Sequence, residues 1–411
     1  MINIIKDLYK INRPLVGAGY DSSLEYINHL IDLNIIEIPS GTECWTWTVP
    51  QAWEVKDAWV KFNGKKILNY KKKPLCLSAG SVPFSGTMDL AELKKHLYYD
   101  VEKPKVTQYV HGYYDKKWGF SIPHKKFEKL KEGEYEVLVD TKLTDGTLKI
   151  GEHIIKGKSN REIWVIIHLD HPFQANDGLS QVAMAIDLSK KLKCNHTVKI
   201  LFVPETIGSI AYVHKFGTEN LDFVITADMV GNDNTLCINK SFNNNDKLNK
   251  AAQLALSGQG TTFRIAPWRA PLGADEYIFG DPFINKPAIL FHRYPYKEYH
   301  TSDDTPDIII EEKLEETRDI IMKTIEIMEK DYIPVRNFKG PLMRSKFKVQ
   351  SIMKETNRQL DFLIYGIDGE RSLIELSFIC ALDFDTTYNL LEKLHEKNLC
   401  SRASQIGQQE A

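Results

Sequence analysis

Five consecutive apolar residues, Ile163–Ile167, form the most informative hydrophobic run of the chain. Such a run has no side left for solvent, which is typical of a strand buried on both faces in a parallel sheet covered by helices. Polar residues follow at once, since His168 ends the run and Asp170 and Asp177 come soon after it. In open α/β sheets the carboxyl end of a strand faces the crevice where ligands bind. We therefore expect a functional site at this strand end.

The pattern of apolar strand, polar residue and amphipathic helix then repeats along the chain. Three further runs lead into polar residues: Val198–Val203 before Glu205, Leu221–Ala227 before Asp228, and Ala288–Phe291 before a loop that contains His300. One acid at a helix start is commonplace as a cap. A doubly wound sheet, however, brings its strand ends to one edge. The pattern predicts an α/β fold, a mostly parallel sheet with helices on both faces, with these residues in one crevice.

The first third of the chain has a different texture. Residues 1 to about 35 carry two helical patterns, and residues 41–125 carry short aromatic and β-branched runs broken by Pro and Gly. We interpret 41–125 as a β-rich domain inserted into a discontinuous catalytic domain, 1–40 and 126–335. Within the latter, Glu134–Asp140 alternates like the edge strand of a sheet.

The C-terminal segment 342–411 follows an expected linker, 333–341. Ser372 and Glu375 have the spacing of a capping box before an apolar stripe, and a second helix is expected to open at Asp385. Two short helices joined by a tight turn resemble a winged-helix domain. The second helix mixes acidic and basic residues, so DNA binding is not expected. Protein contact or domain packing is the alternative role.

Composition narrows the class of protein. The chain has 411 residues, 43% of them hydrophobic, and a net charge of -2. This favours two or three globular domains and gives no general attraction to nucleic acid or anionic membranes. The start lacks an apolar signal core and no run approaches a membrane span, so we expect a cytoplasmic location. Six scattered cysteines without C-x-x-C spacing suit neither a disulfide framework nor a thiolate zinc site.

Imidazole and carboxylate groups at neighbouring strand ends favour a divalent cation, and zinc is the metal that such mixed sites usually bind. The alternative for any single one of these residues is structural, such as a core histidine or a capping acid. Five motifs in order nevertheless resemble those of the co-catalytic zinc aminopeptidases, the zinc-exopeptidase fold that includes bacterial leucyl aminopeptidases. These are His168-Leu-Asp170, Asn176-Asp177-Gly-Leu-Ser, Pro204-Glu205-Thr-Ile-Gly, Ala227-Asp228-Met-Val-Gly and Tyr299-His300-Thr-Ser. More closely, the whole chain is similar to a bacterial group with an aminopeptidase-like domain, an inserted β-rich domain and a C-terminal winged helix.

That resemblance implies roles for the matching residues. His168 and Asp228 would hold one metal, His300 a second, and Asp177 would bridge them. Asp170 would accept a hydrogen bond from a metal-bound imidazole. Glu205 would be the general base that takes a proton from metal-activated water.

One position departs from the family pattern. The family has a ligand carboxylate directly after the base, whereas this chain has Thr206. We therefore expect one firmly bound zinc, with the second site short of a ligand. Alternatively, Glu205 itself turns to the metal and no base remains. His171 and Glu298 are close enough in sequence to compensate, but we interpret each as a structural or surface residue.

The expected function is a zinc-dependent, aminopeptidase-like hydrolase that cleaves an N-terminal peptide bond or a related amide. The alternatives are a degenerate peptidase with a regulatory role through its winged helix, and a metal-dependent deacylase. Asp275 and Glu276 are candidates to bind a substrate amine, and Arg269 and Arg293 a substrate carboxylate, although either pair could be a surface ion pair. A homo-oligomer is compatible with the sequence, which leaves the side-chain preference open.

Overall fold

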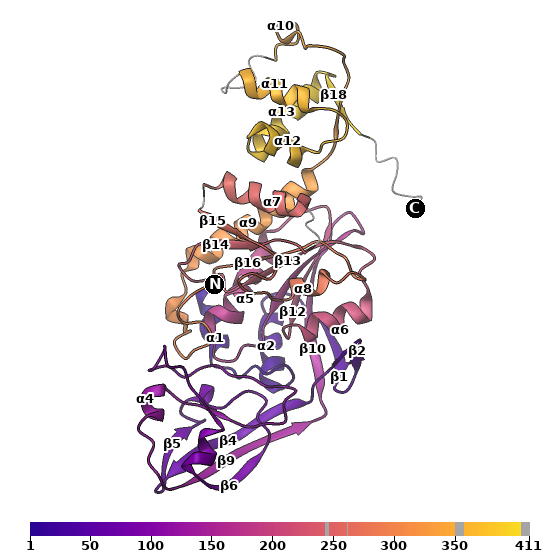
Figure 1. Ribbon diagram of the computed structural model, residues 1–411. Helices are drawn as coiled ribbons and strands as arrows, with labels where there is room; N and C mark the ends of the chain where they lie inside the picture. Colours follow the sequence, from indigo (N-terminus) through magenta and orange to yellow (C-terminus); the bar gives the residue numbers. More distant parts are fainter. Residues whose placement is uncertain (243–245, 261, 350–356, 404–411) are drawn as a thin grey trace. The chain divides into compact units, whose positions relative to one another are not determined.

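The computed structural model describes residues 1–242, 246–260, 262–349 and 357–403 (Figure 1). The chain divides into two compact units. One comprises Met1–Phe242 and Arg264–Arg318, and the other comprises Asn243–Phe263 and Asp319–Ala411. No helix in the described residues is both long and apolar enough to cross a membrane.

An eight-stranded sheet forms the centre of the first unit. Its strand order is β1-β10-β12-β11-β13-β16-β14-β15. The strands are β1 (Asn34–Pro39), β10 (Thr147–Ile155), β11 (Glu162–His168), β12 (Thr197–Val203), β13 (Leu221–Asp228), β14 (Leu236–Asn239), β15 (Phe263–Ala266) and β16 (Ala288–His292). The four middle strands, β12, β11, β13 and β16, pair in parallel, whereas β1, β10 and β14 pair antiparallel. The expected mostly parallel sheet is thus corrected to a mixed sheet with a parallel centre.

The apolar run Ile163–Ile167 lies in β11. Because its side chains are buried, this strand takes a place in the middle of the large sheet. Trp164 and Ile166 pack with α6 (Ile207–Phe216) and α8 (Glu276–Phe279) in one core cluster. The strand also packs against α5 (Gln181–Lys191). Two N-terminal helices, α1 (Ile2–Tyr9) and α2 (Ala18–Asn28), and the first turns of α9 (Glu311–Lys330) also belong to this unit.

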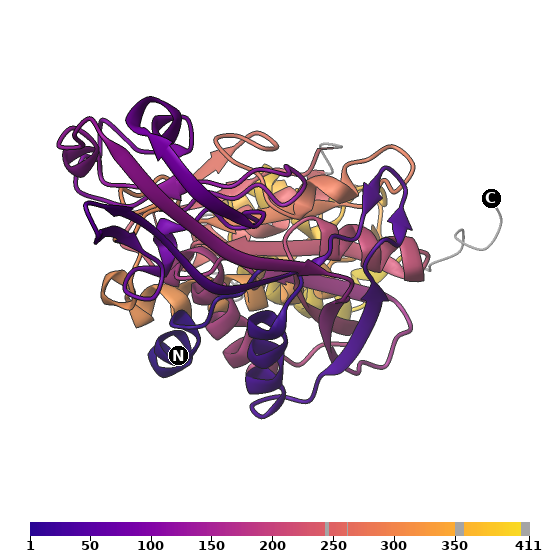
Figure 2. The same cartoon turned by 90° about the horizontal axis from the view of Figure 1, so that it is seen from below.

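A second, four-stranded sheet has the order β5-β4-β9-β6. Its strands are β4 (Ala52–Phe62), β5 (Lys65–Asn69), β6 (Phe84–Asp89) and β9 (Glu134–Thr144). The expected edge strand, Glu134–Asp140, is therefore wrong, because β9 lies between β4 and β6. After residues 145–146 the chain enters β10 of the large sheet, a path seen in Figures 1 and 2. The boundary at residue 125 stays a prediction. However, β9 lies beyond this boundary and is still part of the small sheet.

The first unit also contains short elements outside the two sheets: β2 (Glu43–Cys44), β3 (Trp47–Thr48), η1 (Pro74–Cys76), α3 (Leu90–Lys94), β7 (Leu97–Tyr98), β8 (Phe120–Ser121), α4 (His124–Phe127), η2 (Ala175–Ser180) and η3 (Pro306–Ile308). A single bridge pairs Gln108 with Thr301. This bridge joins the β-rich segment to the loop that contains His300.

The second unit contains α7 (Asp246–Gly258), α10 (Arg344–Phe347), α11 (Asn357–Gly366), α12 (Leu373–Cys380), α13 (Phe384–Glu396), β17 (Pro334–Arg336) and β18 (Cys400–Arg402). The expected capping box is confirmed, with Ser372 and Glu375 at the start of α12. The cap of α13 is Asp383 rather than Asp385. The expected linker 333–341 is partly a strand, since β17 pairs with β18. The winged helix stays a prediction, and residues 350–356 and 404–411 of it lie outside the described residues.

Candidate metal centre

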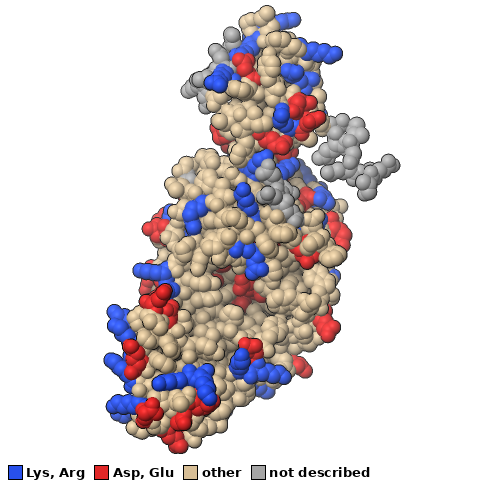
Figure 3. Space-filling view, in the orientation of Figure 1, with Lys and Arg blue, Asp and Glu red and all other residues tan. Residues whose placement is uncertain are grey.

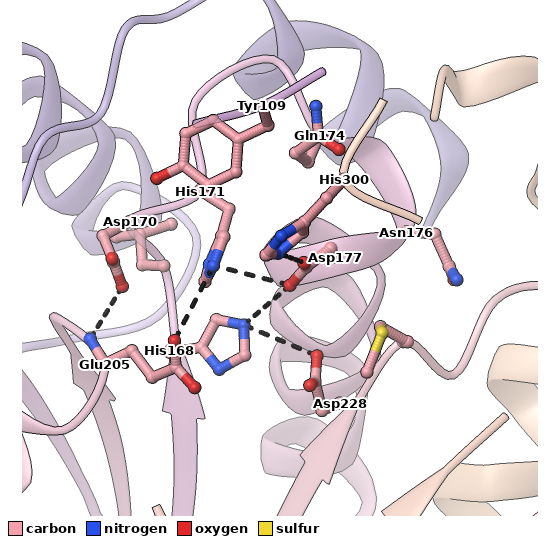
Figure 4. Close-up of polar contacts among 12 residues, drawn as sticks. Tyr109, His168, Asp170, His171, Gln174, Asn176, Asp177, Glu205, Asp228 and His300 are labelled. Atoms are coloured by element: carbon pink, nitrogen blue, oxygen red, sulfur yellow. Dashed lines mark hydrogen bonds and ion pairs between the residues drawn. The ribbon is translucent and has the colours of Figure 1, made fainter. Parts of the chain in front are cut away.

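Four residues expected to hold metal converge on one point (Figure 4). His168 ends β11, Asp177 lies in the irregular turn η2 before α5, and Asp228 ends β13. The Nε2 atom of His168 lies 3.2 Å from Oδ1 of Asp177 and 3.4 Å from Oδ1 of Asp228. On the other side, Nε2 of His300 lies 2.9 Å from Oδ2 of Asp177. Asp177 therefore presents one oxygen to each imidazole.

These donor atoms fit a zinc ion. Two ligand atoms about 2.0–2.1 Å from a tetrahedral zinc lie about 3.3 Å apart, and the separations of His168 from Asp177 and Asp228 are 3.2 and 3.4 Å. Two buried ring nitrogens, Nδ1 of His171 and Nε2 of His300, have no hydrogen-bond partner. Although His300 is close to Asp177, the pair is not aligned as a hydrogen bond. Buried polar atoms without a partner are costly, so both nitrogens suit a ligand that binds lone pairs.

His171 is the residue of the centre that sequence analysis set aside. It is 5% exposed, and His168, His171 and Asp177 offer ligand atoms that all lie within 4.8 Å of one another. Its Nδ1 lies 3.6 Å from Oδ1 of Asp177, and its Nε2 lies 3.6 Å from Oε2 of Glu205. Of the two interpretations given to it, a structural or a surface residue, its burial excludes the surface position, and the structural role stays a prediction. The H-x-x-H spacing with His168 was the available signal. Glu298, the other candidate, pairs instead with Lys297 at 3.3 Å.

Burial and the surrounding charges set the protonation of this cluster. Burial lowers the pKa of His171 well below its usual value, which leaves a neutral imidazole with a free lone pair. Burial raises the pKa of Asp228 to about 8, although the nearby His168 opposes this shift. For Asp177, burial alone would raise the pKa, but His171, His168 and His300 together lower it well below its usual range. Asp177 is thus the firm anion of the centre.

Gln181 is a further residue that sequence analysis missed. Its side chain is fully buried, and Nε2 lies 3.2 Å from Oδ1 of Asp228 and 3.0 Å from Nε2 of His168. Its Oε1 accepts a hydrogen bond from the backbone N–H of Met229 at 3.2 Å. Gln181 therefore ties the end of β13 to His168.

Glu205 follows β12 and lies on the wall of the adjoining pocket. Its backbone N–H donates to Oδ1 of Asp170 at 2.7 Å. Asp170 thus accepts this hydrogen bond from the backbone N–H of Glu205, whereas we expected the donor to be an imidazole. Burial raises the pKa of Asp170 to about 6 and that of Glu205 well above its usual range. A carboxylate with a raised pKa binds a proton more readily near neutral pH.

The backbone N–H and the side chain of Thr206 form hydrogen bonds with Asp275 and Tyr277 rather than with the candidate metal ligands. Its φ of 66° lies in the left-handed region, which is unfavourable for a β-branched residue. The backbone N–H of Thr206 donates to Oδ1 of Asp275 at 2.9 Å, and its side chain forms a hydrogen bond with Tyr277. These contacts account for the strained backbone, and they leave the position after Glu205 without a ligand side chain.

The remaining candidates for substrate binding are mostly buried. Asp275, Glu276 and Arg293 are 2%, 1% and 1% exposed, so the alternative of surface ion pairs is wrong for them. Arg293 donates to the carbonyls of Val230 and Asn234 and to Glu316. Arg269 lies over the ring of Tyr277 at 4.5 Å. None of these four candidates lines the pocket beside Glu205.

That pocket has a volume of about 390 Å³. It is lined by Leu15, Trp47, Tyr109, His111, Gly112, Tyr113, Tyr114, Asp115, Asp170, His171, Glu205, Thr206 and Ile207. Aromatic rings and carboxylates dominate the wall, and among the described residues no Lys or Arg contributes to it. Figure 3 shows acidic side chains inside a hollow of the molecular surface.

Two buried charged residues hold the loops that carry the ligands. Asp304 accepts hydrogen bonds from the backbone N–H groups of Ala175, Asn176 and Asp177, at 3.1, 2.7 and 3.2 Å. Arg13 donates to the carbonyl of Leu169 at 2.8 Å and to that of His171. No local sequence pattern predicts these contacts, because each of the two residues binds a loop that is far away in the chain.

Comparison with known proteins shows the fold and the family. The chain is 30% identical over 397 residues to a Clostridium acetobutylicum protein provisionally named as a polysaccharide biosynthesis protein with an aminopeptidase-like domain, covering 93% of this chain and 91% of that protein. The crystal structure of a C. acetobutylicum protein, provisionally assigned as a peptidase, matches with a TM-score of 0.87 and 29% identity, over 98% of this chain and 96% of that one.

Two more distant structures share the fold. The zinc aminopeptidase BSAP from Bacillus subtilis matches with a TM-score of 0.60 and 16% identity, over 79% of this chain and 93% of that one. A peptidase M28 precursor from Shewanella amazonensis matches with a TM-score of 0.55 and 14% identity, over 80% and 92%. Residues 2–331 match the family model described as a domain of unknown function (DUF4910), and with the relative at 30% identity this match shows that the chain belongs to that family.

Proposed function

We propose that this protein is a metal-dependent hydrolase of aminopeptidase type, which cleaves the N-terminal amide bond of a peptide or a related amide. The observation that supports this most is that His168, Asp177 and His300 lie together. Beside them, two buried ring nitrogens, Nδ1 of His171 and Nε2 of His300, have no hydrogen-bond partner. A carboxylate suited to act as a base, Glu205, lies 3.6 Å from His171 at the edge of the pocket.

Zinc suits this set of imidazoles and carboxylates. His168 and Asp228 would hold one ion, which we expect to be the firmly bound one, with Asp177 as the shared ligand. His300 would contact a second, weaker ion at the other oxygen of Asp177. His171 faces the same oxygen of Asp177 as His168 does, so it would add a nitrogen ligand to the first ion. The second site would then lack the carboxylate that Thr206 does not supply.

A bound zinc ion would supply a water of lowered pKa and polarise the substrate carbonyl. Glu205 would receive the proton from that water and pass it to the leaving amine, because its carboxylate lies next to His171 and lines the pocket. Asp170 would keep this base in place through the backbone N–H of Glu205. Arg13 and Asp304 would hold the loops on either side.

The pocket favours a substrate with a protonated amine. Asp115, Asp170 and Glu205 lie on its wall, and no Lys or Arg from the described part of the chain lines it to pair with a carboxylate or phosphate. Aromatic rings such as Trp47 and Tyr114 provide apolar contact and cation–π partners. The same aromatic wall supports a second candidate, a deacylase of amino-sugar amides, since sugars also pack on aromatic rings. DNA is not among the proposed partners, and the winged helix at 342–411 is proposed as a module for protein contact.

Metal content and turnover test this proposal together. Elemental analysis of the purified protein should return about one zinc per chain, and aminoacyl chromogenic amides should be hydrolysed unless a chelator is present. Glu205→Gln should abolish hydrolysis and retain the zinc. Glu298→Gln, which changes a partly exposed glutamate paired with Lys297, is the matched control and should behave like the wild type. Full activity of Glu205→Gln would show that the assigned base is wrong, and a metal-free, fully active protein would contradict the proposed class.

A further inference from the structure

The β-rich segment places Tyr109 against the candidate metal centre and Tyr113 on the wall of the adjoining pocket, and main-chain hydrogen bonds fix Tyr109 in its place. The backbone N–H of Tyr109 donates to the carbonyl of His300 at 2.7 Å. The carbonyl of Thr107 accepts from the backbone N–H of Ser302 at 2.8 Å. Tyr109 and His300 are therefore held together by main-chain hydrogen bonds, so the tyrosine keeps its place whatever the substrate.

The ring of Tyr109 packs against two imidazoles of the centre. Its centroid lies 5.5 Å from that of His171 and 5.2 Å from that of His300, with both pairs in edge-to-face geometry. Tyr109 is 6% exposed, and its hydroxyl lies 3.3 Å from the hydroxyl of Tyr113. Figure 4 shows this ring beside His171.

The hydrogen bond between the two hydroxyls can run in either direction, since either phenol can be the donor. Each phenol has one proton to donate, and a buried donor without an acceptor is costly. With the buried Tyr109 as the donor to Tyr113, the proton of Tyr113 is free to point into the pocket. Tyr113 lines that pocket together with Tyr109, Glu205 and His171.

We propose that Tyr113 donates its O–H to the carbonyl oxygen of the substrate amide and stabilises the oxyanion that forms there, with Tyr109 as its positioning residue. This inference rests on the proposed hydrolase function. As water attacks, the new C–O bond forms and the electron pair of the C=O bond moves onto the carbonyl oxygen. The O–H of Tyr113 donates a hydrogen bond to this negatively charged oxygen. On collapse that pair re-forms the carbonyl, the C–N bond breaks, and the amine leaves with the proton that Glu205 received. Tyr113 keeps its own proton throughout.

A neutral donor is available across the physiological pH range. Burial raises the pKa of Tyr113, and the nearby Asp170 raises it further. A preorganised donor aimed at developing charge in a site that excludes water is worth more in the transition state than in the ground state. The role therefore predicts an effect on kcat rather than on KM.

Tyr113→Phe separates this role from a structural one. We expect kcat to fall about 100-fold with little change in KM, and the zinc content to stay at the wild-type level. Tyr109→Phe should lower kcat less, because Tyr113 keeps its hydroxyl but loses its fixed partner. Tyr99→Phe is the control, since Tyr99 is a partly exposed tyrosine of the same β-rich segment that does not line the pocket. A change in KM alone, or no change at all, would overturn the proposal.

Binding of a tetrahedral analogue keeps this test independent of turnover. We expect calorimetry to show that Tyr113→Phe binds the boronic-acid analogue of leucine about 100-fold more weakly than the wild type, while leucine itself binds equally well to both. Equal affinity of the two proteins for the boronic acid would overturn the role of Tyr113. If the wild type binds the analogue but hydrolyses no amide, the proposed function is wrong. The affinities of the wild type and Tyr113→Phe for the analogue still show whether Tyr113 forms the hydrogen bond.

Discussion

Removal of the Asp304 side chain should destabilise the loop that carries Asp177. Asp304 is fully buried, and its two oxygens accept from the backbone N–H groups of Asn176 and Asp177, at 2.7 and 3.2 Å, and from the hydroxyl of Tyr296 at 2.7 Å. A third N–H, that of Ala175, also reaches the main-chain carbonyl of Asp304 and keeps that partner in a variant. Asp304→Ala therefore leaves three buried donors without an acceptor.

The size of the effect follows from that count. Each buried donor left without a partner costs about 1–3 kcal/mol, and the hydroxyl of Tyr296 can turn to a water that enters the vacated space. We expect Asp304→Ala to lose about 3–5 kcal/mol of unfolding free energy. Asp304→Asn should lose about 1–2 kcal/mol, because its amide oxygen still accepts from the loop.

Urea unfolding of the metal-free protein, followed by tryptophan fluorescence, measures this difference. Because the chain has two compact units, the comparison must use the transition that reports on the first unit. Asp303→Ala, an exposed neighbour, is the control and should stay within about 0.5 kcal/mol of the wild type. If Asp304→Ala also stays within that range, the carboxylate does not order the loop and the account of how Asp177 is held is refuted.

Two further predictions concern other buried charged or titratable groups. Arg13→Met should lower the unfolding free energy by about 3–5 kcal/mol and weaken zinc binding, because the carbonyls of Leu169 and His171 lose their donor; wild-type urea unfolding and zinc titration would contradict this. Burial lowers the pKa of His292 to about 3, so its stabilising contribution is present above pH 6.5 and is lost as the pH falls towards 3. Between pH 6 and 4 the unfolding free energy of the wild type should therefore fall by about 1.4 kcal/mol per pH unit more than that of His292→Gln, and parallel profiles would refute it.

Periodicity and strand-end logic located much of the candidate site. His168, Asp177, Asp228 and His300 could be placed together because parallel strands deliver their carboxyl ends to one edge, and the parallel centre of the sheet brings them within ion-pair distance. The conformation of the loops could not be predicted. His171 turns inward because the buried Arg13 binds its carbonyl, a contact between residues 158 positions apart.

The same limit explains the error over β9. Alternation in Glu134–Asp140 indicates a half-buried strand correctly, but alternation says nothing about which strands flank it. Its neighbours, β4 and β6, come from far earlier in the chain, so only the tertiary pairing makes it central.

The position of the β-rich segment also changes how its role should be understood. A separate inserted domain could in principle be removed without loss of the catalytic machinery. Here, however, its Tyr109 donates a backbone hydrogen bond to His300, and its residues 109 and 111–115 form one wall of the pocket beside Glu205. Since loops far apart in sequence reach their geometry only through such contacts, the segment helps to hold the loop of the candidate ligand His300 in place. The centre is therefore a joint product of the large sheet and the β-rich segment, and changes in that segment should alter the geometry of His300 as directly as changes in its own loop.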